Sequence, residues 1–232
     1  MKEKFKEYAD RQVLVNDLAE RIGRLLKQGV KENGRASFAV SGGSTPVDLF
    51  ERLSILDIPW LNVVVTLVDE RWVEPTASDS NENLVRTHLL KNRAVAAVFV
   101  GMKKSAKTAR EGERECKMSL EKISLPFDVL ILGLGSDGHT ASLFPYATRL
   151  DEATDLNSGR ICMGIMPLTA PHERMTLTLP AILDAKQIFL HIVGQEKKKV
   201  FQAAQADGPS KKMPIRFILR EQKSPVDVYW AP

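Results

Sequence analysis

The chain has 232 residues, of which 44% are hydrophobic and 27% charged, a balance that is typical of a globular protein and excludes a disordered one. This length is sufficient to bury a core without disulfides or metal ions, and we expect a single α/β domain over residues 1–232. The net charge of +4 suits a small anionic substrate, although a solvated basic surface explains it equally well, and the low aromatic content of 6% argues against a nucleic-acid partner.

The predicted elements alternate between helices and short apolar strands. Apolar residues at helical spacing predict a helix over 10–33 that stops at Gly34. Strands are predicted at 37–40, 63–68, 128–132, 174–179 and 188–193, and helices at 47–53, 81–90 and 106–123, with a last helix that begins near Gly194. Strands that are apolar throughout and alternate with helices indicate a mostly parallel sheet with helices on both faces.

Three of the predicted strands end in polar loops that contain glycine or charged residues. These loops are 41–46, 69–71 and 133–139. In open parallel sheets the ligand binds outside the carboxyl ends of the strands. We therefore expect the three loops to meet in one crevice.

The first loop has the composition of an anion-binding turn. Gly42 and Gly43 let the backbone turn its N–H groups toward a ligand, and Ser44 and Thr45 add hydroxyl donors. Together with the positive end of the following helix they form a cradle suited to phosphate. The loop lacks the Gly-Lys-Ser/Thr ending of a nucleotide P-loop, and a plain strand-to-helix turn is the alternative interpretation.

The second loop places three charges directly after an apolar strand. Charges at a buried strand end are costly unless they are paired. One interpretation is a structural ion pair between a carboxylate and Arg71. The functional interpretation is that Arg71 polarises a carbonyl group or binds an anion while Asp69 or Glu70 holds it, so Asp69 and Arg71 are candidate catalytic residues.

The third loop matches the dinucleotide-binding fingerprint literally, through Gly133, Gly135 and Gly138. The fingerprint also needs a long following helix and an acidic residue about 20 residues on, but Pro145 would end a helix within two turns. Asp137 and His139 flank the last glycine. Histidine titrates near neutrality and can take a proton from water, and a nearby aspartate can orient its ring. A lone histidine is more often structural, but this position at a strand end favours catalysis.

Together these segments resemble the glucosamine-6-phosphate isomerase/6-phosphogluconolactonase family over nearly the whole chain. The matching segments are 41–46, 69–71 with 80–81, 133–145, 174–178 and 194–197. The block 133–145 is highly specific, whereas 227–232 fits the family pattern poorly. The resemblance implies a Rossmann-like α/β domain that binds a sugar 6-phosphate without a metal ion, nucleotide or other cofactor.

Two positions separate the branches of that family. The deaminases carry Asn-Glu-Pro after the histidine, whereas 141–145 here reads Ala-Ser-Leu-Phe-Pro and has no carboxylate. Arg71 stands where the deaminases have an aromatic residue. The resemblance therefore implies hydrolysis of 6-phosphoglucono-δ-lactone to 6-phosphogluconate, in the oxidative branch of the pentose phosphate pathway.

For this reaction we predict that His139 is the general base and that Asp137 orients it. Arg71 and loop N–H groups would stabilise the oxyanion. The phosphate would lie on the loop 41–45, with Lys197 and Arg174 neutralising its charge.

Two other functions remain open. A serine hydrolase would use Ser136 or Ser142 near His139, although the chain lacks the Gly-x-Ser-x-Gly elbow. A non-catalytic sugar-phosphate sensor would use the same cradle without turnover.

The remaining expectations concern partners and location. Cys116 and Cys162 do not have metal-ligand spacing, so we expect no metal ion. No apolar run has the length of a membrane helix, and the N-terminal sequence has no apolar stretch typical of a signal peptide. We expect a soluble, cytoplasmic monomer.

Overall fold

The computed structural model describes residues 4–221 and 223–232. The strands are β1 (Lys4–Glu7), β2 (Ala36–Val40), β3 (Val63–Leu67), β4 (Asp69–Arg71), β5 (Val98–Val100), β6 (Val129–Leu132), β7 (Cys162–Ile165), β8 (Arg174–Leu177), β9 (Ile188–Val193) and β10 (Val226–Ala231). The α-helices are α1 (Arg11–Asn33), α2 (Val47–Ile55), α3 (Asn81–His88), α4 (Ala109–Leu120), α5 (Leu150–Thr154), α6 (Leu179–Leu183), α7 (Gln195–Gln205) and α8 (Ile215–Arg220). Short 3-10 turns lie at Trp60–Asn62, Asn92–Ala96 and Ser210–Lys212.

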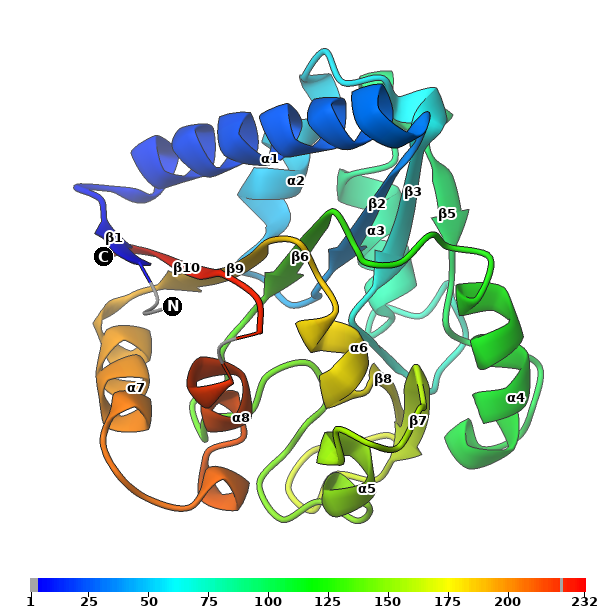
Figure 1. Cartoon of the computed structure of the whole chain (residues 1–232), viewed down its shortest axis with the longest axis vertical. Coiled ribbons are helices and arrows are strands. Elements are labelled where there is room, and N and C mark those ends of the chain that lie inside the picture. Colours follow the sequence, from blue (N-terminus) through cyan, green and yellow to red (C-terminus); the bar gives the residue numbers. More distant parts are fainter. Residues whose placement is uncertain (1–3, 222) are drawn as a thin grey trace.

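A parallel sheet with the strand order β1-β10-β9-β6-β2-β3-β5 forms the centre of the molecule. Helices α1 and α2 cover one face, and α7 and α8 lie on the other (Figure 1). The residues of β2 and β6 are buried throughout, because helices exclude water from both faces of these strands. The predicted fold class, a mostly parallel α/β sheet with helices on both faces, is confirmed.

The first helix begins and ends where its sequence signals place it. The Asp10 side chain accepts a hydrogen bond from the backbone N–H of Val13, and Gly34 ends the helix with φ of 74°. The helix predicted over 47–53 begins at Val47 as expected and continues to Ile55 as α2. The helix predicted near Gly194 is α7, but it is not the last one, because α8 follows it.

A second, smaller sheet has the order β4-β8-β7 and is antiparallel. The segment 69–71, predicted as a loop, is the strand β4 of this sheet. Its pairing with β8 places Arg71 directly opposite Arg174. Because β4 follows β3 after a single residue, the small sheet extends beyond the carboxyl ends of the large one, where the ligand site was expected.

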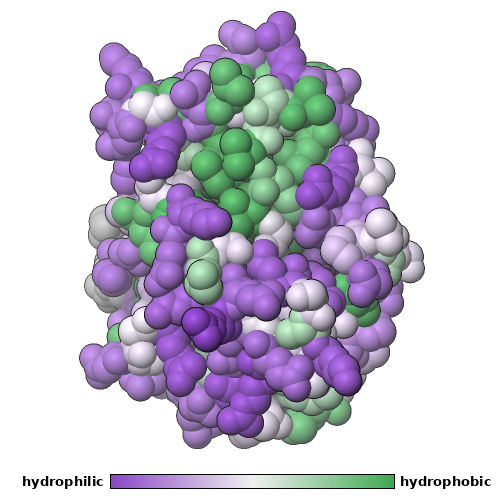
Figure 2. Space-filling view, turned by 90° about the vertical axis from the view of Figure 1, so that its right-hand side faces the viewer, coloured by the Kyte–Doolittle hydropathy of each residue, from purple (hydrophilic) through white to green (hydrophobic). Residues whose placement is uncertain are grey.

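The side of the molecule that carries the edge strand β5 has an apolar patch on its surface (Figure 2). Exposed apolar side chains in and beside this strand include Leu61, Val95 and Val98. In the parts of the chain that the structure describes, no helix is long and apolar enough to cross a membrane.

Candidate active site

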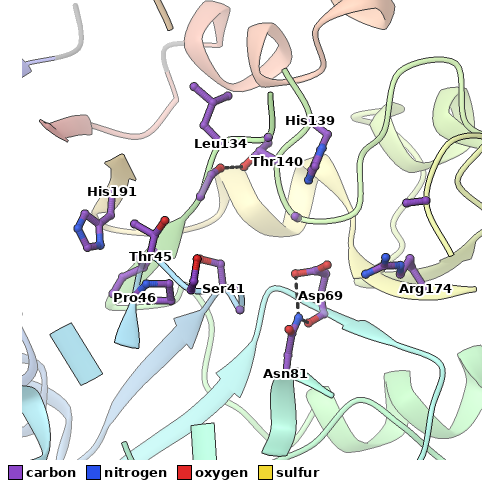
Figure 3. Close-up of a pocket in the computed structure, with 18 of the residues that line it drawn as sticks. Ser41, Thr45, Pro46, Asp69, Asn81, Leu134, His139, Thr140, Arg174 and His191 are labelled. Carbon is purple, nitrogen blue, oxygen red and sulfur yellow. Dashed lines mark hydrogen bonds between the residues drawn. The ribbon is translucent and has the colours of Figure 1, made fainter. Parts of the chain in front are cut away.

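One cavity of about 360 Å³ lies at the carboxyl ends of β2, β6 and β9. Most of the predicted site residues line it: Gly42, Gly43, Ser44, Thr45, Asp69, Arg71, His139, Arg174 and Lys197. Asp137 does not line the cavity but contacts His139. The three predicted loops therefore do meet in one crevice, with the small sheet as an additional wall (Figure 3).

The loop 41–46 connects β2 to α2 and needs glycine at two positions. Gly43 has φ of 89°, in the left-handed region that favours glycine. A Cβ atom at Gly42 would lie 1.8 Å from Oδ1 of Asn81, so any other residue would displace the Asn81 side chain. Helix α2 has no side-chain cap at its N-terminus, and the N–H of its first residue, Val47, makes only a long hydrogen bond of 3.4 Å to the carbonyl of Ser44, so this helix end can bind an anion.

His139 is held by Asp137 on one side and by an aromatic ring on the other. Oδ1 of Asp137 accepts hydrogen bonds from Nδ1 of His139 at 2.6 Å and from its backbone N–H at 3.0 Å. The Phe144 ring stacks on the imidazole, with ring centroids 4.1 Å apart. A Cβ atom at Gly135 would lie 2.1 Å from Nδ1, so glycine is needed here for the imidazole to fit against the loop.

The contact with Asp137 also sets the chemistry of the imidazole. Partial burial acts to raise the pKa of Asp137, but the hydrogen bonds and charge of His139 outweigh it and lower that pKa overall. An ionised carboxylate accepts hydrogen bonds only, so Nδ1 carries the ring proton. Nε2 is then unprotonated in the neutral ring, which is the form that a general base requires.

Asp69 lies in the floor of the cavity and is 7% exposed. Its Oδ2 accepts a hydrogen bond of 2.6 Å from the Ser142 hydroxyl, and its backbone carbonyl accepts one of 2.8 Å from the side-chain amide of Asn81. In Figure 3 the Asp69 carboxylate lies below His139 and between Ser41 and Arg174. A fixed carboxylate in this place is an acceptor for hydroxyl groups of a ligand.

Glu70 faces away from the cavity and holds the start of α3. Its carboxylate accepts hydrogen bonds from the backbone N–H groups of Arg71, Asn81 and Glu82 and from the Ser80 hydroxyl, at 2.7 to 3.0 Å. Burial raises the pKa of Glu70, and these donors act against that shift. Because the carboxylate satisfies N–H groups that a helix start leaves free, its role is structural.

The expected ion pair between Arg71 and a neighbouring carboxylate is not formed within residues 4–221 and 223–232. The Arg71 guanidinium instead donates to the backbone carbonyl of Asp79, while the neighbouring Glu70 is used by α3 and Asp69 by Ser142. Both predictions, a structural ion pair and a carboxylate that holds Arg71, are therefore wrong. A backbone carbonyl fixes the side chain, and its positive charge is not neutralised at close range.

Arg174 extends the positive charge of that wall. It is 6% exposed, donates to the carbonyl of Pro171 at 3.0 Å and lies with its guanidinium 5.6 Å from the centre of the Phe144 ring. Burial lowers its pKa, although an arginine remains charged near neutrality. The structure does not bring Arg174 next to Thr45, because the two lie on opposite sides of the cavity (Figure 3).

Lys197 reaches the cavity from the first turn of α7 and is half-buried. The start of this helix is fixed by β10: the Gly194 N–H donates to the carbonyl of Ala231 at 2.8 Å, and the Trp230 indole N–H donates to the carbonyl of Gly194 at 2.9 Å. The segment 227–232 thus holds a residue of the cavity in place.

His191 is a cavity residue that the sequence did not reveal. It lies in the apolar run of β9, where a single polar residue reads as part of the core. The one signal in the sequence that could have identified His191 is its place in β9, the strand that leads into the helix carrying Lys197. Burial lowers its pKa to about 4, so the ring is neutral near pH 7.

Neither serine of the serine-hydrolase interpretation is bonded to His139. The Ser142 hydroxyl is fully buried and donates to Asp69, and Ser136 is exposed on the protein surface. A nucleophilic serine needs a hydrogen bond to its base, so the geometry disfavours this mechanism. Across the described residues, no group of three or more His, Cys, Asp or Glu side chains is arranged to hold a metal ion.

Comparison with known proteins agrees with this site. The family model described as glucosamine-6-phosphate isomerases/6-phosphogluconolactonase matches residues 9–230. A 6-phosphogluconolactonase of Rhizobium meliloti is 42% identical over 94% of this chain and 94% of its own length, and one of Mesorhizobium japonicum is 43% identical over 97% and 94%. The crystal structure of a 6-phosphogluconolactonase from Shewanella baltica OS155 superposes with a TM-score of 0.97, at 44% identity over 100% of this chain and 98% of that one. The chain therefore belongs to the glucosamine-6-phosphate isomerase/6-phosphogluconolactonase family.

Proposed function

We propose that this chain hydrolyses 6-phosphoglucono-δ-lactone to 6-phosphogluconate, in the oxidative branch of the pentose phosphate pathway, with His139 as the general base. The activity follows from membership of the family and from relatives above 40% identity that are named 6-phosphogluconolactonases. The observation that supports the mechanism is the imidazole of His139, which lines the cavity with Nδ1 bonded to Asp137 and Nε2 available.

The reaction begins at Nε2 of His139. This nitrogen takes a proton from a water molecule while the water oxygen forms a bond to C1 of the lactone. The bond between C1 and the ring oxygen then breaks, and the protonated imidazole returns the proton to that oxygen. Asp137 stabilises the imidazolium between the two steps, because its carboxylate is ionised and bonded to Nδ1.

Arg71 stabilises the negative charge that develops on the carbonyl oxygen. Its cross-strand neighbour Arg174 adds a second positive charge on the same wall. Preorganised charges are effective because they need no reorganisation during the reaction. The carboxylate of Asp69 accepts hydrogen bonds from sugar hydroxyl groups and so fixes the ring between these arginines and the base.

The phosphate group lies at the other end of the cavity, on the loop 41–45 and beside Lys197. The uncapped N-terminus of α2 and the glycine-rich backbone supply N–H donors, and Lys197 supplies a positive charge. Arg174, which the sequence predicts to neutralise the phosphate charge, lies across the cavity from Thr45 (Figure 3), and we propose that it acts at the carbonyl end instead. Binding the phosphate at one end places C1 near His139 at the other.

The assay compares two substrates. We expect proton release from 6-phosphoglucono-δ-lactone and no ammonia from glucosamine 6-phosphate, because the segment 142–144 stands where a deaminase has its glutamate and carries no carboxylate. Ammonia release without lactone hydrolysis would refute the proposal. Thermal stabilisation by 6-phosphogluconate without turnover of either substrate would identify a sensor.

The remaining proposals concern the form of the protein. We propose one domain over residues 1–232 and a cytoplasmic monomer without a cofactor. In support, Cys116 and Cys162 are both free and buried, as is common in a reducing compartment. Light scattering at micromolar concentration should give a mass near 25.9 kDa, and twice that value would contradict a monomer and point to the apolar patch beside β5.

A further inference from the structure

His191 is a buried polar side chain without a partner. It is 3% exposed, and neither ring nitrogen has a hydrogen-bond partner in the described parts of the chain. Its neighbours along β9 are apolar, and the strand lies inside the sheet between β10 and β6. Buried polar groups are nearly always hydrogen-bonded, so an unpaired imidazole in this position requires an explanation.

His191 is also one of the residues that line the cavity. It lines the cavity on the same side as Thr45 and Pro46, away from Arg174 (Figure 3). Along the chain it lies three residues before Gly194, where β9 leads into α7 and Lys197. His191 is therefore at the end of the cavity that binds the phosphate in the proposed function.

The state of the ring restricts what it can recognise. Burial keeps the imidazole neutral near pH 7, so it has one N–H donor and no charge. A phosphate monoester in its ionised form offers only acceptor oxygens. Its charge is met by Lys197 and the start of α2, which leaves the imidazole to supply a directed hydrogen bond.

We propose that His191 is a substrate-binding residue whose ring N–H donates a hydrogen bond to the phosphate group of the phosphorylated lactone. This inference rests on the proposed function. The unfavourable, unpaired state in the free protein is relieved when the ligand binds, so the imidazole favours phosphorylated over unphosphorylated lactones. It takes no part in proton transfer, because His139 already does so from the opposite side of the cavity.

Two variants test this role, with kinetics on two substrates. His191→Leu should raise KM for 6-phosphoglucono-δ-lactone about ten-fold, the low end of what a hydrogen bond to a charged group contributes, while KM for unphosphorylated glucono-δ-lactone stays the same. The free variant should unfold at the same or a higher temperature, since an unpaired polar group has been removed. The matched variant His191→Gln keeps an N–H donor and should recover part of the lost affinity.

The thermal shift caused by saturating 6-phosphogluconate should be smaller in His191→Leu than in the unaltered protein. Unchanged KM in His191→Leu, or an equal rise of KM for both lactones, would overturn the inference while leaving the proposed function intact. Failure of the unaltered protein to hydrolyse either lactone would instead overturn the proposed function.

A measurement on the unaltered protein covers the case in which the leucine variant does not fold. Histidine labelled with ¹⁵N gives a ring signal for His191, identified by its absence in His191→Gln. Addition of 6-phosphogluconate should shift this signal, because the N–H acquires an acceptor. An unshifted signal at saturating 6-phosphogluconate would overturn the inference.

Discussion

The substitution Asp137→Asn removes the negative charge beside His139 while keeping nearly the same shape. In the unaltered protein, Oδ1 of Asp137 accepts two hydrogen bonds from His139, one of them 2.6 Å from Nδ1. A hydrogen bond to a charged group contributes about 1.5–3 kcal/mol, which corresponds to about 10–150-fold in rate. The side chains of His139 and Asp137 are 30% and 38% exposed, so water screens the pair and favours the lower part of that range.

A second effect of the same substitution acts on the tautomer of His139. An asparagine amide can donate to Nδ1, which moves the ring proton to Nε2 and blocks proton uptake from water. We therefore expect kcat to fall at least about ten-fold, and by more if the tautomer with the proton on Nε2 dominates. KM should stay within about two-fold of its original value. The melting temperature should change little, because the loop is on the surface.

The assay follows proton release at neutral pH in weak buffer, after subtraction of the spontaneous opening of the lactone. His139→Ala is the reference variant and should lower kcat by about 10²–10⁴-fold. The double variant should be no slower than His139→Ala, since the two residues act as a unit. An unchanged kcat in Asp137→Asn, or losses that multiply in the double variant, would refute the coupling of Asp137 to His139.

Four further predictions concern stability, substrate binding and metals. Glu70→Ala leaves three donors at the start of α3 and the N–H of Arg71 unpaired, and it should lower the free energy of unfolding by about 3–5 kcal/mol, measured by urea denaturation; a loss below about 1 kcal/mol would contradict its capping role. The neutral native ring of His191 has a pKa of about 4, whereas the unfolded ring takes up a proton below about pH 6.5, so stability is lost as pH falls from about 6.5 to about 4. In His191→Leu the free energy of unfolding should fall by about 3 kcal/mol less over this pH range. If the free energy of unfolding depended on pH in the same way in both proteins, this contribution of His191 would be excluded. Lys197→Ala should mainly raise KM for the phosphorylated lactone, and an equal loss on the unphosphorylated one would argue against its phosphate role. Treatment with a chelator should leave the activity intact, and activity that returns only with zinc would reveal a metal site.

The sequence predicts those parts of the fold whose burial produces a clear pattern of apolar residues. Strands β2, β3, β6 and β9 are mostly apolar because helices cover the central sheet on both faces. The candidate site follows from the same rule, since loops at the carboxyl ends of such strands converge. His139 and its neighbour Asp137 are found because chemistry-bearing residues stand out in a glycine-rich turn.

The parts that the sequence misses depend on distant partners. Strand β4 consists of three charged residues and reads as a loop, since its antiparallel partner β8 lies about a hundred positions further along the chain. Glu70 reads as a partner for Arg71, because nothing in its own segment shows that it caps a helix ten residues later. His191 reads as core because only the cavity distinguishes it from its apolar neighbours.

The pairing of β1 with β10 has a consequence for the order of folding. Lys4 is in register with Asp227, so residues near one end of the chain find their strand partner only when those near the other end are in place. Such non-local contacts are slow to form, and a truncated chain without β10 would expose β9 as an open edge that favours aggregation. Loss of β10 would also remove the hydrogen bonds that hold Gly194 at the start of α7, so a nascent chain cannot complete the Lys197 end of the cavity before β10 is available.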